Sequence, residues 1–215
     1  MTGPIVVINP NSTQAVTDGI AAALGAVEGE AIECLTLTEG PPGIESDDHV
    51  AAVIGPLCDL VRTRPDAGAF VNACFSDPGL AAVRAATPRP VFGIGESAYL
   101  AACDQGRRFG VLSILPAAVA RHARYIEELG LTPYCAGDRA LGLGVVELAD
   151  EKRTAARLLE VGRALRDHDG AETLILGCAG MAGHRGALEE ALELPVVEPC
   201  QAAVARARGQ LAGAE

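Results

Sequence analysis

The 215-residue sequence predicts an α/β protein made of two similar lobes, each with a mostly parallel sheet covered by helices. One observation is that short apolar runs alternate with longer amphipathic segments along the chain, an order typical of parallel sheets. The other is that several features recur at a spacing of 104 or 105 residues. They are Cys74 and Cys178, Pro90-Val91 and Pro195-Val196, and the strands that begin at Ile5 and Gly110. This recurrence indicates a duplicated α/β unit.

The first half is expected to contain four strands and several helices. The expected strands are Ile5–Ile8, Ala31–Thr36, Ala69–Ala73 and Val91–Ile94. The expected helices run from Ser12 or Thr13 to about Gly25, from Asp47 to Arg62 with a kink at Pro56, and onward from Pro78. We expect that last helix to begin at Pro78 because Asp77 is a good N-cap and proline fits the first helical turn.

The second half restarts the same pattern. The expected strands are Phe109–Ile114, Leu131–Cys135, Leu174–Leu176 and Val196–Val197, and Gly137–Gly144 is expected to be a loop. The expected helices are Ala117–Leu129, Asp150–Asp167, one that ends near Leu192, and Pro199–Leu211. Strands thus alternate with helices in both halves, as a parallel sheet requires.

Composition excludes several classes of partner. The formal net charge is -11 and Lys and Arg do not cluster, which argues against nucleic acid and anionic membranes as partners. We expect no secretory signal at its start, and its sequence has no apolar run of the about 18 residues that a membrane span needs. Its seven cysteines are odd in number and form no C-x-x-C pair, which predicts reduced thiols in the cytoplasm and no zinc site. A small-molecule ligand is therefore expected.

The two recurring cysteines are the leading functional candidates. A single cysteine after a strand is more often a small buried hydrophobe than a functional group. Cys74 and Cys178, however, each follow an apolar strand and precede a helix. Two facing lobes would bring both to one cleft at the carboxyl ends of the strands, where α/β sheets bind ligands. The nearby helix start is expected to lower the pKa of the Cys74 thiol. Opposed thiols suit the removal of a proton from one face of a carbon and its return to the other face.

Other groups could complete such a site. Backbone N–H groups around Phe75, Ser76, Ala179 and Gly180 could stabilise an enolate, although the glycine could equally serve only a tight turn. Asn11 and Ser113 sit at equivalent strand ends and could hold a substrate carbonyl. Helix capping by the asparagine or a buried core hydroxyl are the alternatives.

Several polar residues have more ordinary expected roles. Glu96 and Glu198 follow the last strand of each half and could line the cleft or cap helices. His122 and His168 are expected to be solvated on their helices, and Cys200 to begin the last helix. The segment Gly93–Ala98 fits the G-x-G-x-x-A dinucleotide fingerprint, but it follows a late strand and no acidic strand end lies about 20 residues on. We therefore expect no nicotinamide or flavin cofactor.

Five segments, in order, resemble the aspartate/glutamate/hydantoin racemase superfamily, specifically its hydantoin racemase branch, which includes allantoin racemases. They are INPNST (8–13), NACFSDPGL (72–80), RPVFGIGESA (89–98), LGCAGMAG (176–183) and LPVVEPCQAA (194–203). The resemblance implies two flavodoxin-like lobes related by a pseudo-twofold axis, with the active site in the cleft between them. It implies that residues 1–97 and 199–215 form one lobe and residues 98–198 the other.

The same resemblance implies an activity and a set of site residues. Its catalytic pair carries over to Cys74 and Cys178, with no cofactor, and a homo-oligomer is expected. Its substrate pocket carries over to Asn11, Pro42, Ile44, Phe75, Ser76, Ser113, Ala179 and Gly180. The expected function is a racemase acting on a hydantoin-type substrate, either a 5-substituted hydantoin or allantoin.

Two departures from the family and two alternatives bear on that function. Ser76 stands where relatives often have glycine, and Glu198 where they often have aspartate, so the preferred side chain of the substrate is open. One alternative is a cis–trans isomerase or decarboxylase of a small dicarboxylate. The presence of both cysteines disfavours the decarboxylase, and the few fixed cations evident near the site loops disfavour any dicarboxylate substrate. The other is a binding protein that has kept the fold.

Overall fold

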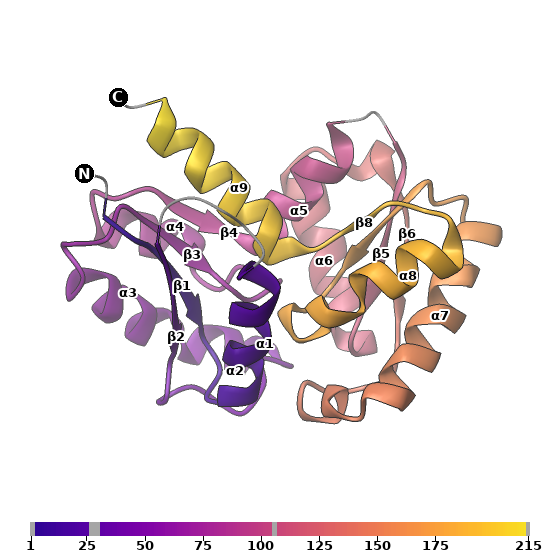
Figure 1. Ribbon diagram of the computed structural model, residues 1–215, viewed down its shortest axis with the longest axis horizontal. Coiled ribbons are helices and arrows are strands. Elements are labelled where there is room, and N and C mark those ends of the chain that lie inside the picture. The colour runs from indigo at the N-terminus through magenta and orange to yellow at the C-terminus, as the bar shows by residue number, and fades with distance from the viewer. Residues whose placement is uncertain (1–2, 26–30, 105–106, 214–215) are drawn as a thin grey trace.

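The computed structural model describes residues 3–25, 31–104 and 107–213. Among these, the strands form two four-stranded sheets, in the orders β2-β1-β3-β4 and β6-β5-β7-β8. Every pair of neighbouring strands is parallel. The two sheets lie side by side, each with helices packed against it (Figure 1). The predicted α/β fold with two similar parallel sheets is confirmed.

The first sheet closely follows the expected strands. Its strands are β1 (Ile5–Asn9), β2 (Ile32–Thr36), β3 (Ala69–Asn72) and β4 (Val91–Gly93). Its helices are α1 (Gln14–Leu24), α2 (Asp47–Ala52), α3 (Ile54–Arg62) and α4 (Leu80–Ala86). The expected helix from Asp47 to Arg62 is broken at Val53, not merely kinked at Pro56. A continuous helix would need an N–H at Pro56 to reach the carbonyl of Ala52, and proline has none.

The second sheet repeats the first. Its strands are β5 (Phe109–Ser113), β6 (Cys135–Ala140), β7 (Thr173–Leu176) and β8 (Val196–Val197). Its helices are α6 (Pro116–Glu128), α7 (Glu151–Asp167) and α8 (Arg185–Leu192), with short 3-10 turns at η1 (Thr132–Tyr134), η2 (Val146–Ala149) and η3 (Ala179–His184). Ile5 pairs with Ala69 in the first sheet, and Phe109 pairs with Thr173 in the second, 104 residues later for both partners.

One strand of the second sheet was predicted in the wrong place. The segment expected as strand Leu131–Cys135 is mostly the 3-10 turn η1, which contains Pro133. The strand β6 begins only at Cys135 and crosses Gly137–Ala140, which was expected to be loop. Its polar sequence, CAGDRA, has little intrinsic strand preference. Pairing with β5 at the edge of the sheet therefore decides its conformation.

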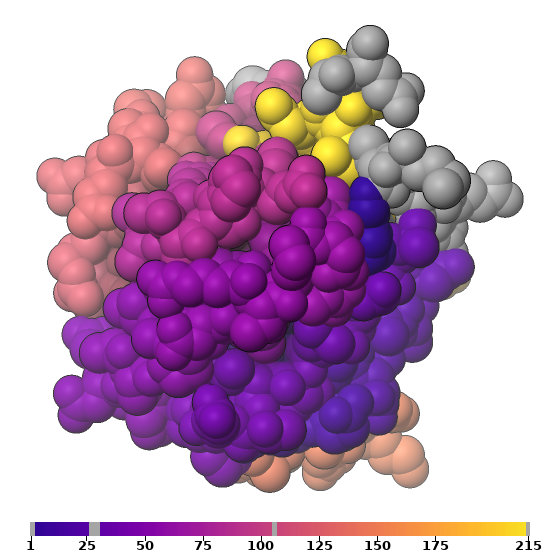
Figure 2. Space-filling view, turned by 90° about the vertical axis from the view of Figure 1, so that its left-hand side faces the viewer, coloured from indigo at the N-terminus to yellow at the C-terminus, as the bar shows by residue number. Residues whose placement is uncertain are grey.

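Two helices join the halves. Helix α5 (Ile94–Cys103) follows β4 and contacts strands of both sheets, and helix α9 (Pro199–Ala212) returns to pack on α5, β3 and β4. On the side of the first lobe, the yellow atoms of α9 lie beside the atoms of the N-terminal half (Figure 2). The lobe boundaries at residues 97/98 and 198/199 stay a prediction. Residues 1–2, 26–30, 105–106 and 214–215 of the two predicted lobes lie outside the described residues.

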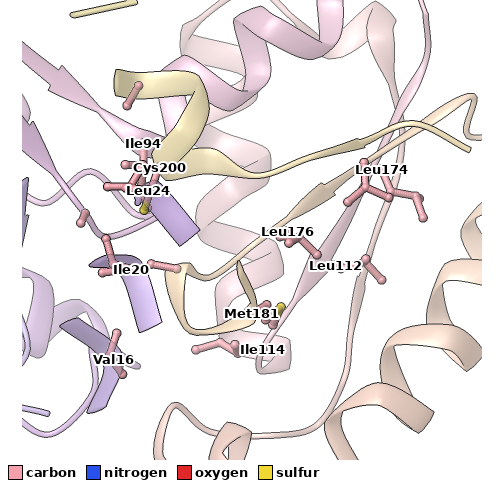
Figure 3. Close-up of a cluster of buried hydrophobic side chains, with 14 of the residues drawn as sticks. Val16, Ile20, Leu24, Ile94, Leu112, Ile114, Leu174, Leu176, Met181 and Cys200 are labelled. Atoms are coloured by element: carbon pink, nitrogen blue, oxygen red, sulfur yellow. The ribbon is translucent and has the colours of Figure 1, made fainter. Parts of the chain in front are cut away.

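The hydrophobic core runs through both lobes. Alternate residues of each strand face opposite sides of its sheet, as the two-residue period of a strand dictates. Val16, Ile20 and Leu24 of α1 belong to the same buried cluster as Leu112 and Leu176 of the second sheet (Figure 3). Because this cluster is continuous, the loops at the strand ends of the two sheets are held in a fixed relation to each other.

Candidate active site

A small cavity lies where the carboxyl ends of the two sheets meet. Cys74 and Cys178 both line it, each two residues beyond the end of its strand, β3 for Cys74 and β7 for Cys178. Its volume is about 30 Å³, which is room for about two water molecules. Residues that follow β1, β3, β5 and β7 contribute to its wall, so both sheets build it.

The two cysteines have equivalent local surroundings. The sulfur of Cys74 accepts a hydrogen bond from the backbone N–H of Ser76, and the sulfur of Cys178 accepts one from the backbone N–H of Gly180. Each donor is two residues beyond its cysteine, and the two donors are again 104 residues apart. Such bonds favour a thiolate over a thiol. Each thiol therefore has a built-in donor that can stabilise its charged form.

Burial nevertheless dominates the acidity of both thiols. Burial raises the pKa of Cys74 to about 12 and that of Cys178 to about 11, against the opposing effect of their N–H donors. Negative charges on Cys178 and on Asp77 raise the pKa of Cys74 further. The expected lowering of the Cys74 pKa by a helix start was wrong, because α4 begins only at Leu80.

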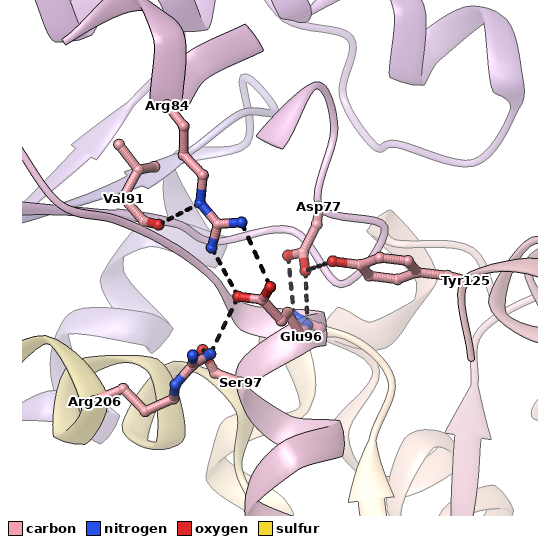
Figure 4. Close-up of polar contacts among 8 residues, drawn as sticks. Asp77, Arg84, Val91, Glu96, Ser97, Tyr125 and Arg206 are labelled. Atoms are coloured by element: carbon pink, nitrogen blue, oxygen red, sulfur yellow. Dashed lines mark hydrogen bonds and ion pairs between the residues drawn. The ribbon is translucent and has the colours of Figure 1, made fainter. Parts of the chain in front are cut away.

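Asp77 was expected to cap the helix that follows it, but the N-cap residue of α4 is Gly79. The φ of Asp77, at 44°, lies in the left-handed region, which aspartate tolerates better than most residues. Its carboxylate accepts hydrogen bonds from the backbone N–H groups of Gly95 (3.0 Å) and Glu96 (2.7 Å) in the first turn of α5, and from the hydroxyl of Tyr125 (3.0 Å). Figure 4 shows these bonds beside the ion pairs of Glu96. Asp77 thus fastens the loop of Cys74 to α5 and α6.

The glycines of the G-x-G-x-x-A segment serve this contact. A Cβ atom at Gly93 would lie 2.3 Å from the Asp77 carboxylate, and one at Gly95 would lie 2.4 Å from the carbonyl oxygen of Phe75. The N-terminus of α5, where a dinucleotide fingerprint would hold a pyrophosphate, is occupied by the Asp77 side chain. Burial raises the pKa of that carboxyl to about 7.

Arg121 is a cavity residue that the sequence did not reveal. It lies on α6, and its side chain is only 12% exposed. Its Nε donates to Ser76 Oγ (3.2 Å) and its Nη1 donates to Asp47 Oδ1 (2.7 Å). The Ser76 hydroxyl in turn donates a hydrogen bond to the sulfur of Cys74. Among the described residues that line the cavity, the Arg121 guanidinium is therefore the one fixed cation.

His122, one residue further along α6, is also part of the wall. It was expected to be solvated, but it is only 2% exposed. Its Nδ1 lies 2.8 Å from Asp138 Oδ2 and 3.0 Å from Ser113 Oγ, and Ser113 donates to the other oxygen of Asp138. Ser113 itself does not line the cavity. His168, by contrast, is exposed as expected.

The remaining predicted substrate-binding residues fall into two groups. Asn11, Ile44, Phe75, Ser76 and Ala179 line the cavity. Pro42 is exposed outside it, with its carbonyl accepting from Thr13 Oγ1 (2.7 Å), and Gly180 takes part through its N–H to Cys178. In Asn11 the Oδ1 atom already accepts from Asn9 Nδ2 and from the N–H of Thr13. Only its NH₂ group is left to meet a ligand.

The other residues singled out in the sequence lie away from the cavity. Glu198 caps α9 by accepting from the N–H groups of Cys200 and Gln201, and Cys200 is fully buried in the core. Glu96 pairs with Arg84 and Arg206.

Within residues 3–25, 31–104 and 107–213, no group of three His, Cys, Asp or Glu side chains is placed to hold a metal ion. No helix over the same ranges is long and apolar enough to cross a membrane.

Comparison with known proteins places this arrangement in a family. The family model described as Asp/Glu/Hydantoin racemase matches residues 5–207. Hydantoin racemase from Paenarthrobacter aurescens is 35% identical over 207 residues, covering 93% of this chain and 87% of that protein. Two solved structures superpose with a TM-score of 0.91. They are allantoin racemase from Klebsiella pneumoniae (32% identity, covering 98% of this chain and 88% of that one) and from Pseudomonas fluorescens (28%, 96% and 89%). The chain belongs to the Asp/Glu/hydantoin racemase family.

Proposed function

We propose that the protein is a cofactor-independent racemase that interconverts the D and L enantiomers of a hydantoin-type substrate by inverting carbon C5. The observation that carries this proposal is the pair of thiols, Cys74 and Cys178, which line one cavity from equivalent positions in two similar lobes. The hydantoin and allantoin racemases among its relatives support the same substrate class. The seven unpaired cysteines support action in the cytoplasm. A homo-oligomer stays a prediction.

The reaction needs two proton transfers on opposite faces of C5. One cysteine, as thiolate, takes the proton: the C5–H bond breaks, an S–H bond forms, and the electron pair moves onto the oxygen of the adjacent carbonyl. The opposite thiol then gives its proton to the other face of C5 and becomes the thiolate. The enolate between the two steps needs donors, and the peptide N–H groups that follow each cysteine, at Phe75 and Ala179, are the candidates.

A dicarboxylate substrate is a weaker alternative even with Arg121 in the wall. Asp47 already compensates the charge of that guanidinium at 2.7 Å. Two carboxylates would need at least one further cation, and the described residues that line the cavity include no other Arg or Lys. We therefore keep the hydantoin-type ring as the proposed substrate.

Turnover of a panel of compounds in D₂O tests the proposal. Single enantiomers of allantoin, benzylhydantoin, isopropylhydantoin and aspartate are followed by loss of optical rotation, and the achiral maleate is followed by its conversion to fumarate. We expect at least one hydantoin-type compound to racemise, with deuterium incorporated at C5 because the returning proton comes from a thiol that exchanges with solvent. Racemisation without deuterium would rule out the proton-transfer mechanism, and activity on maleate alone would favour the alternative.

Arg121→Met is expected to discriminate between substrates. The ureido group of allantoin offers carbonyl oxygen to a guanidinium, whereas the isopropyl group of isopropylhydantoin does not. Since a hydrogen bond to a charged group contributes about 1.5–3 kcal/mol, we expect KM for allantoin to rise about tenfold or more. KM for isopropylhydantoin should change less than about twofold. Arg124→Met, on the same helix but 60% exposed, is the matched control. An equal rise in KM for both substrates would contradict this role.

A further inference from the structure

We propose that His122 is a substrate-binding residue, which accepts a hydrogen bond at Nε2 from a ring N–H of the substrate, and that Asp138 and Ser113 position it. This inference rests on the proposed function, since it requires a cyclic substrate with an N–H group beside the carbonyls of its ring. The sequence pointed to Ser113 at the end of β5, but not to His122 or Asp138.

The ring of His122 is fixed in orientation from three sides. Asp138 and Ser113 hold Nδ1 at 2.8 Å and 3.0 Å, from strands β6 and β5. Phe75, which follows the catalytic candidate Cys74, meets the imidazole edge to face, with ring centroids 5.0 Å apart and planes at 77°. A side chain held this firmly has little freedom to turn its other nitrogen elsewhere.

These contacts assign the two nitrogens different tasks. The carboxylate of Asp138 is an acceptor, so the nitrogen beside it, Nδ1, carries the hydrogen. Nε2 makes no hydrogen bond to any residue within 3–25, 31–104 and 107–213, yet His122 lines the cavity. In the tautomer with its hydrogen on Nδ1, Nε2 presents a lone pair. It can therefore accept from an N–H of a bound ring.

The His122–Asp138 pair is buried more deeply than a merely structural polar contact needs to be. A histidine that is 2% exposed and a carboxylate whose side chain is 7% exposed have both left water. Apolar side chains at the same positions could hold α6 on the sheet without that desolvation cost. A hydantoin ring has N–H groups on either side of a carbonyl, and an acceptor in the wall would fix which way the ring lies between Cys74 and Cys178.

His122→Asn separates the two roles of the side chain. An asparagine amide can replace Nδ1 as the donor to Asp138, but it has nothing at the position of Nε2. We expect the melting temperature to stay within about 2 °C of the wild type and kcat/KM for the best hydantoin to fall at least tenfold. Asp138→Asn should give a similar fall, because an amide can donate to Nδ1 and so move the hydrogen to Nε2.

N-methylated substrates make the test independent of folding. We would measure the parent hydantoin and its N1-methyl and N3-methyl analogues with the wild type and with His122→Asn. The fall in kcat/KM caused by His122→Asn should nearly vanish for the analogue whose methyl group replaces the hydrogen that the substrate donates to His122. An equal loss for all three compounds, or full activity of His122→Asn, would overturn the inference while the proposed function stands. A wild type that racemises no hydantoin would overturn both.

Discussion

Cys74→Ser and Cys178→Ser are each expected to abolish racemisation, with a loss of at least about 10³-fold in kcat. A serine hydroxyl is far less acidic than a thiol, so it neither forms the base nor gives its proton readily to carbon at neutral pH. Since one residue serves each face of C5, losing either stops the full cycle. The measurement is the decay of optical rotation from each pure enantiomer, followed in both directions.

Deuterium exchange adds a sharper signature. In D₂O, each variant retains one thiol and should still exchange the C5 hydrogen of one enantiomer without inverting it. The two variants should act on opposite enantiomers. Cys103→Ser is the matched control, because this half-buried thiol at the end of α5 lies away from the cavity and its variant should keep full activity. Full racemisation by either cavity variant would refute the two-base mechanism.

The fold could be predicted because its determinants are local. Runs such as Ile5–Asn9 are buried on both faces and read as strands without further context, and the 104-residue spacing relates the two sheets. The same spacing led to Cys74 and Cys178, which the structure places on one cavity. Strand β6 escaped prediction because its conformation depends on pairing with β5, not on its own residues.

His122 and Arg121 could not be recognised as cavity residues from the sequence, and the physical reason is the same for both. His122 depends on Asp138, which is 16 residues away on that same unpredicted strand, and Arg121 depends on Ser76 and Asp47 in the other half of the chain. Polar and charged residues on an amphipathic helix ordinarily face solvent, so the sequence pattern alone favoured exposure of both side chains. Only the packing of α6 over the cavity turns these two inward.

Asp77→Asn is expected to remove a pH dependence of stability that the wild type has. The pKa of this carboxyl is about 7 in the folded protein, against an ordinary value of 3.8. Between pH 4 and pH 7 the folded state therefore keeps a proton that the unfolded state has lost. The free energy of unfolding falls as pH rises through this window, by up to about 4 kcal/mol at about 1.4 kcal/mol per pKa unit.

Denaturant unfolding of wild type and variant at pH 4, 5, 6 and 7 tests this. The asparagine does not titrate, so the difference in unfolding free energy, wild type minus variant, should decline steadily with pH. Asp59→Asn, with its side chain 77% exposed, should change stability by less than about 0.5 kcal/mol and show no such decline. A difference that stays constant from pH 4 to pH 7 would mean that Asp77 keeps an ordinary pKa. Asp77 also ties the loop of Cys74 to α5 and α6. We therefore expect protonation of Asp77 to change the position of the Cys74 thiol as well.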